Sequence, residues 1–217
     1  MTGAKDEAHR LHMGCYRMGA ADSAEGVLSR LVSVVNQKAI EEVREFSVHA
    51  AVVAKDGRAI AMPADSGGGK TTLAASLVID GFSYLSDEAL VIADDGSVIP
   101  YPKPMALSEW SCQTLKIPSV NGETLVMPGD LGGKAHAGPC KLADIIIPTY
   151  GAKTPTFEQE PASSAVTALI EKSFNHYKNP ERAFRLATQA AQRARVWRLN
   201  YDDPLEAAGL IKERLGG

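Results

Sequence analysis

The chain has 217 residues, of which 45% are hydrophobic and 23% charged, a composition that is ordinary for a globular protein with one large domain. Its net charge of −3 gives no reason to expect nucleic acid as a partner. No apolar run approaches the ~20 residues that a membrane helix needs, and the polar residues 1–10 lack a signal-peptide core. Three cysteines (Cys15, Cys112, Cys140) have no metal-like spacing. We therefore expect a cytoplasmic protein with free thiols and no membrane partner.

The N-terminal segment gives mixed signals. Residues 11–18 combine apolar residues with glycine and are compatible with a short strand or with a poorly ordered tail. Asp22 or Ser23 can cap a helix that runs to about Phe46, because its apolar residues lie mostly at helical spacing. We interpret 1–22 as a segment of undetermined structure and 23–217 as a single α/β domain.

A hairpin and a short helix surround the most informative stretch. Residues 47–54 are rich in β-formers, Asp56-Gly57 is typical of a hairpin turn, and 58–62 predict the returning strand. A helical run then begins near Thr72 and ends at Asp80-Gly81, where glycine is suited to the position after the last turn.

The remaining elements alternate between strands and helices. The prolines near residue 102 predict a stiff loop, and the glycine-rich residues 106–140 predict an irregular segment with short strands. The elements expected elsewhere are strands at 82–85, 89–93, 97–100, 124–127, 142–147 and 196–200, and helices at 163–174, 180–194 and 203–215.

Residues 64–72, Ala-Asp-Ser-Gly-Gly-Gly-Lys-Thr-Thr, predict a phosphate-binding loop between a strand and a helix. Consecutive glycines allow several N–H groups to point at one anion, and the helix adds the positive end of its dipole. Lys70 supplies a charge for the β- and γ-phosphates, and the Thr71 hydroxyl is suited to ligate Mg²⁺. The usual first glycine of the motif is replaced by Ala64. The expected nucleotide-binding residues are Asp65, Ser66, Gly67, Gly68, Gly69, Lys70, Thr71 and Thr72.

An acidic pair and a histidine are the other candidates. Asp87 and Glu88 follow a short predicted strand, so they are expected at the carboxyl edge of the sheet, where open α/β sheets bind ligands. A carboxylate there can accept a proton from a substrate hydroxyl; the alternative is a polar turn. His49 lies alone in an apolar strand, where a partly buried structural role is the commoner alternative.

Together these segments resemble the HPr kinase family in its catalytic P-loop domain. His49 lies 21 positions before Lys70, and Glu88 lies 18 after it (49, 70 and 88), as in that family. The similarity is clear over residues 47–100 and looser over 141–215, and its matching segments are Val48-His49-Ala50, residues 64–72, Gly81, Ser86-Asp87-Glu88 and, more loosely, residues 196–201 and 206–208.

The resemblance implies an α/β fold of the HPr-kinase/PEP-carboxykinase-like P-loop type, with a mixed sheet and flanking helices. It also implies transfer of phosphate from ATP to a serine hydroxyl, with Mg²⁺ held by Thr71 and Asp87. Glu88 matches the proton acceptor, although its extra methylene leaves Asp87 as an alternative. His49 matches the active-site histidine, and Lys70 matches the lysine that holds the triphosphate.

Three functions remain open from the sequence. Short members of this group include kinases of lasso-peptide precursors, so a serine kinase acting on a peptide or protein fits best. Ala64, and the lack of a counterpart to the family's second signature after residue 100, favour a nucleotide-binding regulatory module without phosphotransfer. A small-molecule kinase is the third option, because a fold does not fix its substrate. The phosphate donor's base and the oligomeric state, a homo-oligomer included, are also open.

Overall fold

The computed structural model describes residues 9–21, 24–65, 67–119 and 123–216. Contacts within the chain divide it into two units, residues 1–43 and 44–217, and each unit is described by itself. The domain boundary that we place at residue 23 stays a prediction. No helix in the described ranges is long and apolar enough to cross a membrane.

The first unit holds a hairpin and a helix. Strands β1 (His9–Met13) and β2 (Tyr16–Ala21) pair antiparallel, and Gly14, with φ +60°, makes the turn between them. A single strand over residues 11–18 is therefore wrong, because the glycine turn divides it. Helix α1 (Ala24–Glu42) contacts both strands and ends before the expected Phe46, which begins the next strand. The expected caps of α1, residues 22 and 23, lie outside the described residues.

The second unit is built on one mixed sheet of eight strands. Its order is β11-β12-β10-β4-β3-β6-β7, and β5 pairs with β3 beside β6. Strands β4, β10 and β12 run parallel to one another, whereas β3 is antiparallel to β4, β5 and β6. The strands are β3 (Phe46–Lys55), β4 (Arg58–Pro63), β5 (Ser83–Ser86), β6 (Ala89–Ile92), β7 (Ser97–Ile99), β10 (Cys140–Tyr150), β11 (Thr156–Gln159) and β12 (Arg195–Tyr201).

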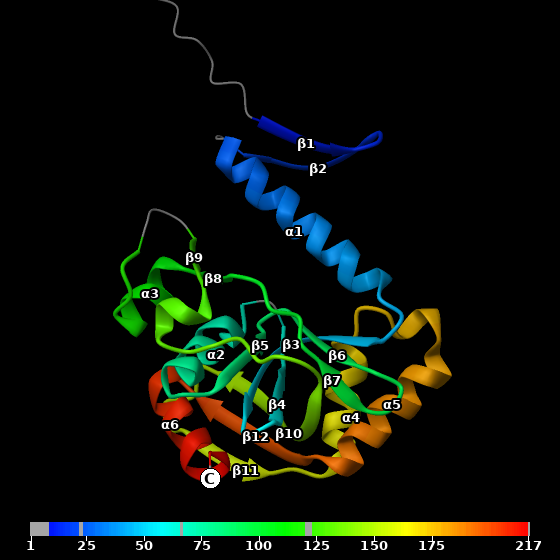
Figure 1. The fold of residues 1–217 in the computed structure, drawn as a ribbon, viewed down its shortest axis with the longest axis vertical. Helices are drawn as coiled ribbons and strands as arrows, with labels where there is room; N and C mark the ends of the chain where they lie inside the picture. The colour runs from blue at the N-terminus through cyan, green and yellow to red at the C-terminus, as the bar shows by residue number, and fades with distance from the viewer. Residues whose placement is uncertain (1–8, 22–23, 66, 120–122, 217) are drawn as a thin grey trace, which may run out of the picture. The chain divides into compact units, whose positions relative to one another are not determined.

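Helices cover both faces of this sheet (Figure 1). Alternate residues of β3 point to opposite sides, as a strand requires. Val52 lies in the cluster with α4 (Ala162–Glu171) and α5 (Pro180–Arg193). Val53 lies in the cluster with α2 (Lys70–Ile79) and α6 (Pro204–Leu215). This arrangement confirms the expected fold class, a mixed α/β sheet with flanking helices.

Local turn and cap signals explain why most predicted elements are present. The β3–β4 turn uses Asp56 and Gly57, both at positive φ, which matches the twist of a tight hairpin. Asn179 caps α5 through its side chain, and Asp203 caps α6 in the same way. The short 3₁₀ turn η2 (His176–Lys178) lies before α5. Strand β11 was not predicted from the sequence, because its four residues carry little periodic signal.

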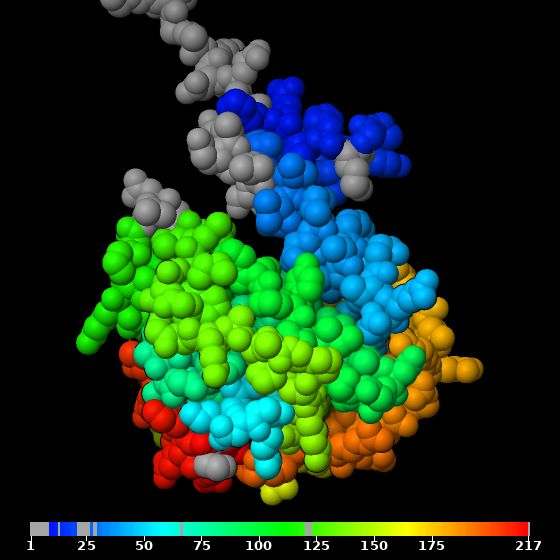
Figure 2. All heavy atoms as spheres, viewed as in Figure 1, coloured from blue at the N-terminus to red at the C-terminus, as the bar shows by residue number. Residues whose placement is uncertain are grey.

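The segment between β7 and β10 is more regular than expected. It contains β8 (Met105–Leu107), α3 (Glu109–Leu115), β9 (Thr124–Val126) and the 3₁₀ turn η1 (Pro128–Leu131). Its apolar residues pack with α2 in a third buried cluster. The corresponding green atoms form much of the visible face of the second unit (Figure 2). The prediction of an irregular segment is therefore wrong for α3, which Ser108 caps by accepting a hydrogen bond from the Ser111 N–H.

Candidate active site

The phosphate loop (residues 64–72) joins β4 to α2 with the expected geometry. Gly67 and Gly69 have φ values of +79° and +75°, which side chains disfavour. The Gly68 N–H donates to the Asp65 carbonyl at 3.1 Å and tightens the turn. The hydrogen bond from Leu73 N–H to the Gly69 carbonyl opens the ladder of α2. The amides before Leu73 in the first turn are therefore outside that ladder and suited to an anion.

Lys70 is folded back over its own loop. Its side-chain Nζ donates to the carbonyls of Ala64 and Asp65, at 2.9 and 2.6 Å, and the residue is 5% exposed. Burial lowers the pKa of Lys70 to about 8, although the neighbouring carboxylates, Glu88 first among them, act in the opposite direction. A phosphate group would give this ammonium a stronger partner than two neutral carbonyls.

The other expected binding residues of the loop are Asp65, Ser66, Thr71 and Thr72. Thr71, on the first turn of α2, is half-buried, as a metal ligand at a solvent-facing site would be. The Thr72 hydroxyl is 2.8 Å from the Ser111 hydroxyl of α3, so it takes part in a hydrogen bond between the two helices. Asp65 accepts two hydrogen bonds of 2.8 Å from Lys172, which lower the pKa of that carboxyl. Ser66, an expected binding residue, lies outside the described residues.

The acidic pair (Asp87, Glu88) lies level with the phosphate loop. Strands β5 and β6 lie in line along the same edge of β3, and the pair occupies the break between them. The Ala50 N–H donates to the Glu88 carbonyl, and Ala50 is also the register partner of Pro63, the last residue of β4. The strand register therefore places the backbone of the pair level with the end of β4, where the phosphate loop begins.

The two carboxylates have different surroundings. Asp87 is 5% exposed; it accepts a hydrogen bond of 2.7 Å from the Tyr84 hydroxyl, and Lys103 Nζ lies 3.0 Å from it. Burial and Asp87 raise the pKa of Tyr84 well above its usual range. The Glu88 side chain is 31% exposed, with Lys103 Nζ at 3.6 Å from its nearer oxygen. Asp87 is thus fixed in place, and Glu88 is the carboxylate that an incoming substrate can reach.

His49 faces Glu88 from the neighbouring strand. Its Nε2 lies 4.0 Å from a Glu88 carboxylate oxygen, and its ring packs on Phe174 with centroids 5.5 Å apart. Burial lowers the pKa of His49 to about 4, and the charge of Lys70 acts in the same direction. The imidazole is therefore neutral at pH 7, and its approach to Glu88 is a polar contact rather than an ion pair.

Two lysines at this site were not predicted from the sequence. Lys103 reaches the acidic pair from the proline-rich loop after β7, and Lys172 reaches Asp65 from the end of α4. Neither belongs to a motif, and Lys172 is 107 positions away from its partner. Only the proline run around Lys103 marks a rigid segment that is able to hold a charge in place.

The residues present fit a magnesium nucleotide better than a metal ion alone. Within the described ranges, no group of three or more His, Cys, Asp or Glu residues is arranged to hold a metal. Magnesium is commonly bound through one or two carboxylates, several waters and substrate phosphates. The Thr71 hydroxyl and one Asp87 oxygen suit such a site, because the Asp87 contacts with Tyr84 and Lys103 are both made through Oδ1.

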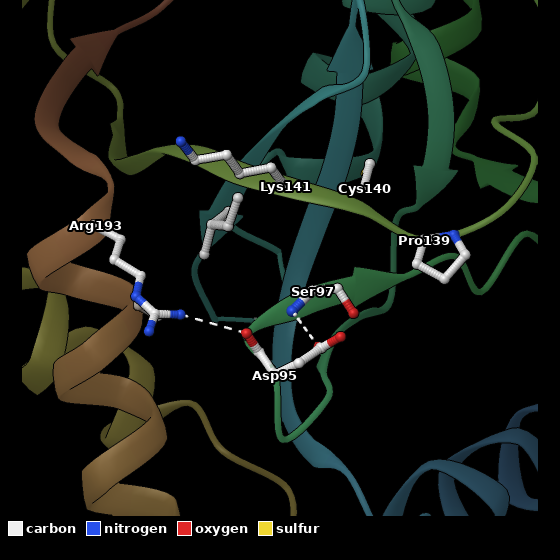
Figure 3. Close-up of a pocket in the computed structure, with 9 residues that line it drawn as sticks. Asp95, Ser97, Pro139, Cys140, Lys141 and Arg193 are labelled. Atoms are coloured by element: carbon white, nitrogen blue, oxygen red, sulfur yellow. Dashed lines mark hydrogen bonds between the residues drawn. The ribbon is translucent and has the colours of Figure 1, made fainter.

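A surface hollow of about 400 Å³ lies away from these residues (Figure 3). It is lined by Cys140 at the start of β10, by Ser97 of β7 and by Arg193 at the end of α5. The phosphate loop, in contrast, lies beside the other end of β10, because β10 runs parallel to β4. The hollow is therefore separate from the candidate active site.

Comparison with protein-family models and with curated proteins finds no match. Among solved structures, the chain is similar to the HPr(Ser) kinase/phosphatase from Coxiella burnetii, with 12% identity and a TM-score of 0.42. The similarity covers 77% of this chain and 89% of that chain. At this level it carries no argument about activity, which has to come from the residues of the site.

Proposed function

We propose that the protein is an ATP- and Mg²⁺-dependent kinase that transfers phosphate to a serine hydroxyl of a peptide or protein. The observation that carries the proposal is the meeting of three groups at one edge of the sheet. Lys70 and the amides of the phosphate loop are suited to the triphosphate. Glu88, with His49 beside it, supplies a reachable carboxylate at the same level of the sheet.

The transfer step uses these groups in fixed roles. The serine Oγ attacks the γ-phosphorus, and the bond from that phosphorus to the β–γ bridging oxygen breaks, releasing ADP. The serine proton passes to the Glu88 carboxylate. Lys70 neutralises charge on the phosphates, and Asp87 with Thr71 would hold Mg²⁺, which stabilises the charge that develops on the leaving oxygens when it is bound. His49, neutral at pH 7, orients Glu88 without competing for its proton.

The choice of a peptide or protein serine as acceptor depends on the HPr kinase resemblance of residues 48–50, 64–72 and 86–88. The geometry adds one point in its favour. Glu88 is partly exposed, so a side chain carried by a large acceptor can reach it from outside. A deeply enclosed carboxylate would instead favour a small molecule.

Intact mass spectrometry tests the proposal directly. The protein is incubated with Mg²⁺, ATP and a panel of serine-containing peptides, including those encoded beside its gene. A gain of one phosphate, about 80 Da, is expected on one acceptor, with ADP formed in equal amount. The Lys70→Ala variant should not transfer, whereas Phe184→Ala, which changes an exposed ring on α5, should transfer as the wild type does. ATP binding without transfer to any peptide, protein or small hydroxyl compound would reject the kinase.

A second candidate function is favoured by Lys103. Its ammonium lies 3.0 Å from Asp87 and 3.6 Å from Glu88, so it already neutralises the carboxylates that a kinase needs. A nucleotide-binding module that signals to a partner would tolerate this arrangement. Partner binding that depends on ATP, that survives Glu88→Gln and that occurs without phosphotransfer would establish this second function.

A further inference from the structure

Three aromatic rings form a continuous row beside the phosphate loop. Tyr150 contacts Trp110 and Tyr201 edge to face, with ring centroids 6.0 and 5.6 Å apart. A Cβ added at Gly69 would lie 2.8 Å from the Tyr201 hydroxyl and 3.8 Å from Tyr150 Cδ2. This aromatic row (Trp110, Tyr150, Tyr201) therefore begins against the last glycine of the loop and leads away from it.

The sheet explains why two of these rings lie there. Strands β10 and β12 run parallel to β4, and Tyr150 and Tyr201 are register partners at their carboxyl ends. The last β4 residue paired with β10 is Ala61, opposite Ile145, so β10 continues to Tyr150 alongside the loop that follows β4. Ligands of open α/β sheets bind at this carboxyl edge.

The third ring is held in place through α3. Ser111, the neighbour of Trp110, shares a hydrogen bond of 2.8 Å with Thr72 in the first turn of α2. The start of α3 is thus tied to the helix that follows the phosphate loop. Trp110 is nevertheless 47% exposed and Tyr150 is 44% exposed. Rings that are fixed at their base and open to solvent offer apolar faces to a flat ligand.

The order of the strands sets the direction of a bound nucleotide. The acidic pair lies on the β3 side of β4, and the aromatic row lies on the β10 side. When the γ-phosphate faces Glu88 and Lys70, the phosphate chain runs along the start of α2 and the nucleoside leaves the loop on the opposite side. We propose that Trp110 and Tyr150 form the seat of the nucleobase. This inference depends on the proposed nucleotide-binding function of the phosphate loop.

Tyr201 adds an independent observation. Its residue is 1% exposed, and its hydroxyl is one of three buried side-chain atoms in the described part of the chain that have no hydrogen-bond partner. An unpaired buried hydroxyl is unfavourable, and this one lies against the glycine that precedes α2. A hydroxyl in that place is suited to donate to an oxygen of a nucleotide near the loop. The Tyr201 ring also packs against Tyr150.

Calorimetric titration with two ligands separates the base from the phosphates. MgATP carries both, whereas magnesium tripolyphosphate carries only the phosphate chain. Stacking of one base on an aromatic side chain contributes about 1–3 kcal/mol, so Trp110→Ala should weaken MgATP binding about tenfold and leave tripolyphosphate binding unchanged. Trp110→Phe should retain most of the affinity, Tyr150→Leu should behave as Trp110→Ala does, and Phe184→Ala is the control for an exposed ring elsewhere.

The outcomes distinguish this inference from the function on which it depends. Equal loss for both ligands, or no loss for either, would overturn the nucleobase seat while leaving the phosphate loop intact. If the wild type binds neither ligand, both the seat and the proposed function are rejected. Selective loss of MgATP affinity supports the nucleobase seat whether or not phosphotransfer is detected in the same samples. Phosphotransfer tests only the proposed kinase activity.

Discussion

The two sides of the phosphate loop differ in their chemistry. On the β3 side, ionisable groups gather closely enough that the charge of Lys70 helps to lower the pKa of His49, while Glu88 opposes the lowering of the pKa of Lys70. On the β10 side, the aromatic row begins at Gly69 and ends at the exposed Trp110. The first side is suited to moving charge and protons, and the second to holding a neutral, flat group.

This difference shows how one loop can be suited both to moving charge and to holding a flat, neutral group. Charged groups must be buried together to act on a phosphate, since an exposed charge is largely screened. Aromatic rings do not have to be buried next to other groups, and they can remain half-exposed until a ligand covers them. The predictions below test whether changes on one side leave the other unaffected.

The largest effect is expected at the acidic pair. Glu88→Gln removes the proposed proton acceptor and keeps its shape, so the transfer rate should fall about 10²- to 10⁴-fold while MgATP affinity stays within a few-fold. Asp87→Asn should weaken the Mg²⁺ dependence instead, since Asp87 is the proposed metal ligand. Rapid-quench rates and ATP titrations measure both effects. Equal transfer rates for Glu88→Gln and the wild type would exclude Glu88 as the base.

The second effect concerns pH and Lys70. In the free protein its pKa is lowered to about 8, and bound phosphates would raise it, so binding takes up a proton above pH 8. MgATP affinity should therefore be full below pH 8 and fall by up to about tenfold per pH unit above it. Lys70→Arg keeps its charge throughout this range and should show no such fall. If the MgATP affinity of the wild type does not change between pH 8 and 9.5, Lys70 does not lose its proton in this range and the prediction is wrong.

The third effect joins the two sides at Gly69. Gly69→Ala places a Cβ at φ +75° and 2.8 Å from the Tyr201 hydroxyl, and should lower the free energy of unfolding by about 2–3 kcal/mol. Tyr201→Phe removes the obstructing oxygen, and the next atom is 3.8 Å away. The double variant should recover about half of the loss, with the backbone strain remaining. Urea unfolding of the wild type, both single variants and the double variant measures the four free energies of unfolding. If the effects of the two substitutions simply add, the contact between the Cβ added at position 69 and the Tyr201 hydroxyl is relieved in some other way.

Much of the charged side, meaning the ionisable groups on the β3 side of the phosphate loop, could be predicted from the sequence, because its signals are local. The glycines of the loop, the Asp56-Gly57 turn and the break that holds Asp87 and Glu88 are each encoded within a few residues. The kinase roles of these residues stay predictions. The strand register, which the sequence does not state, is what brings His49 to within 4.0 Å of Glu88.

The aromatic row could not be predicted in the same way. Trp110 lies on a short helix within a glycine-rich stretch. Tyr150 and Tyr201 end two strands, β10 and β12, between which the chain forms β11, α4, η2 and α5. No periodicity connects the three, because their contact arises from parallel pairing of distant strands and from one hydrogen bond between α2 and α3. Lys103 and Lys172 were missed for the same reason: each reaches the site from a remote segment.

The smallest effect tests that one hydrogen bond. Ser111→Ala removes the partner of Thr72 and the side-chain link to Ser108, at a cost of about 1 kcal/mol in stability. If the bond also positions Trp110, MgATP affinity should fall about two- to fivefold while tripolyphosphate affinity does not change. Thr72→Val, which removes the same bond from the α2 side and keeps the size of the side chain, should match it. If only Thr72→Val lowers MgATP affinity, the effect arises in α2 and the phosphate loop. The hydrogen bond to Ser111 would then have no part in positioning Trp110.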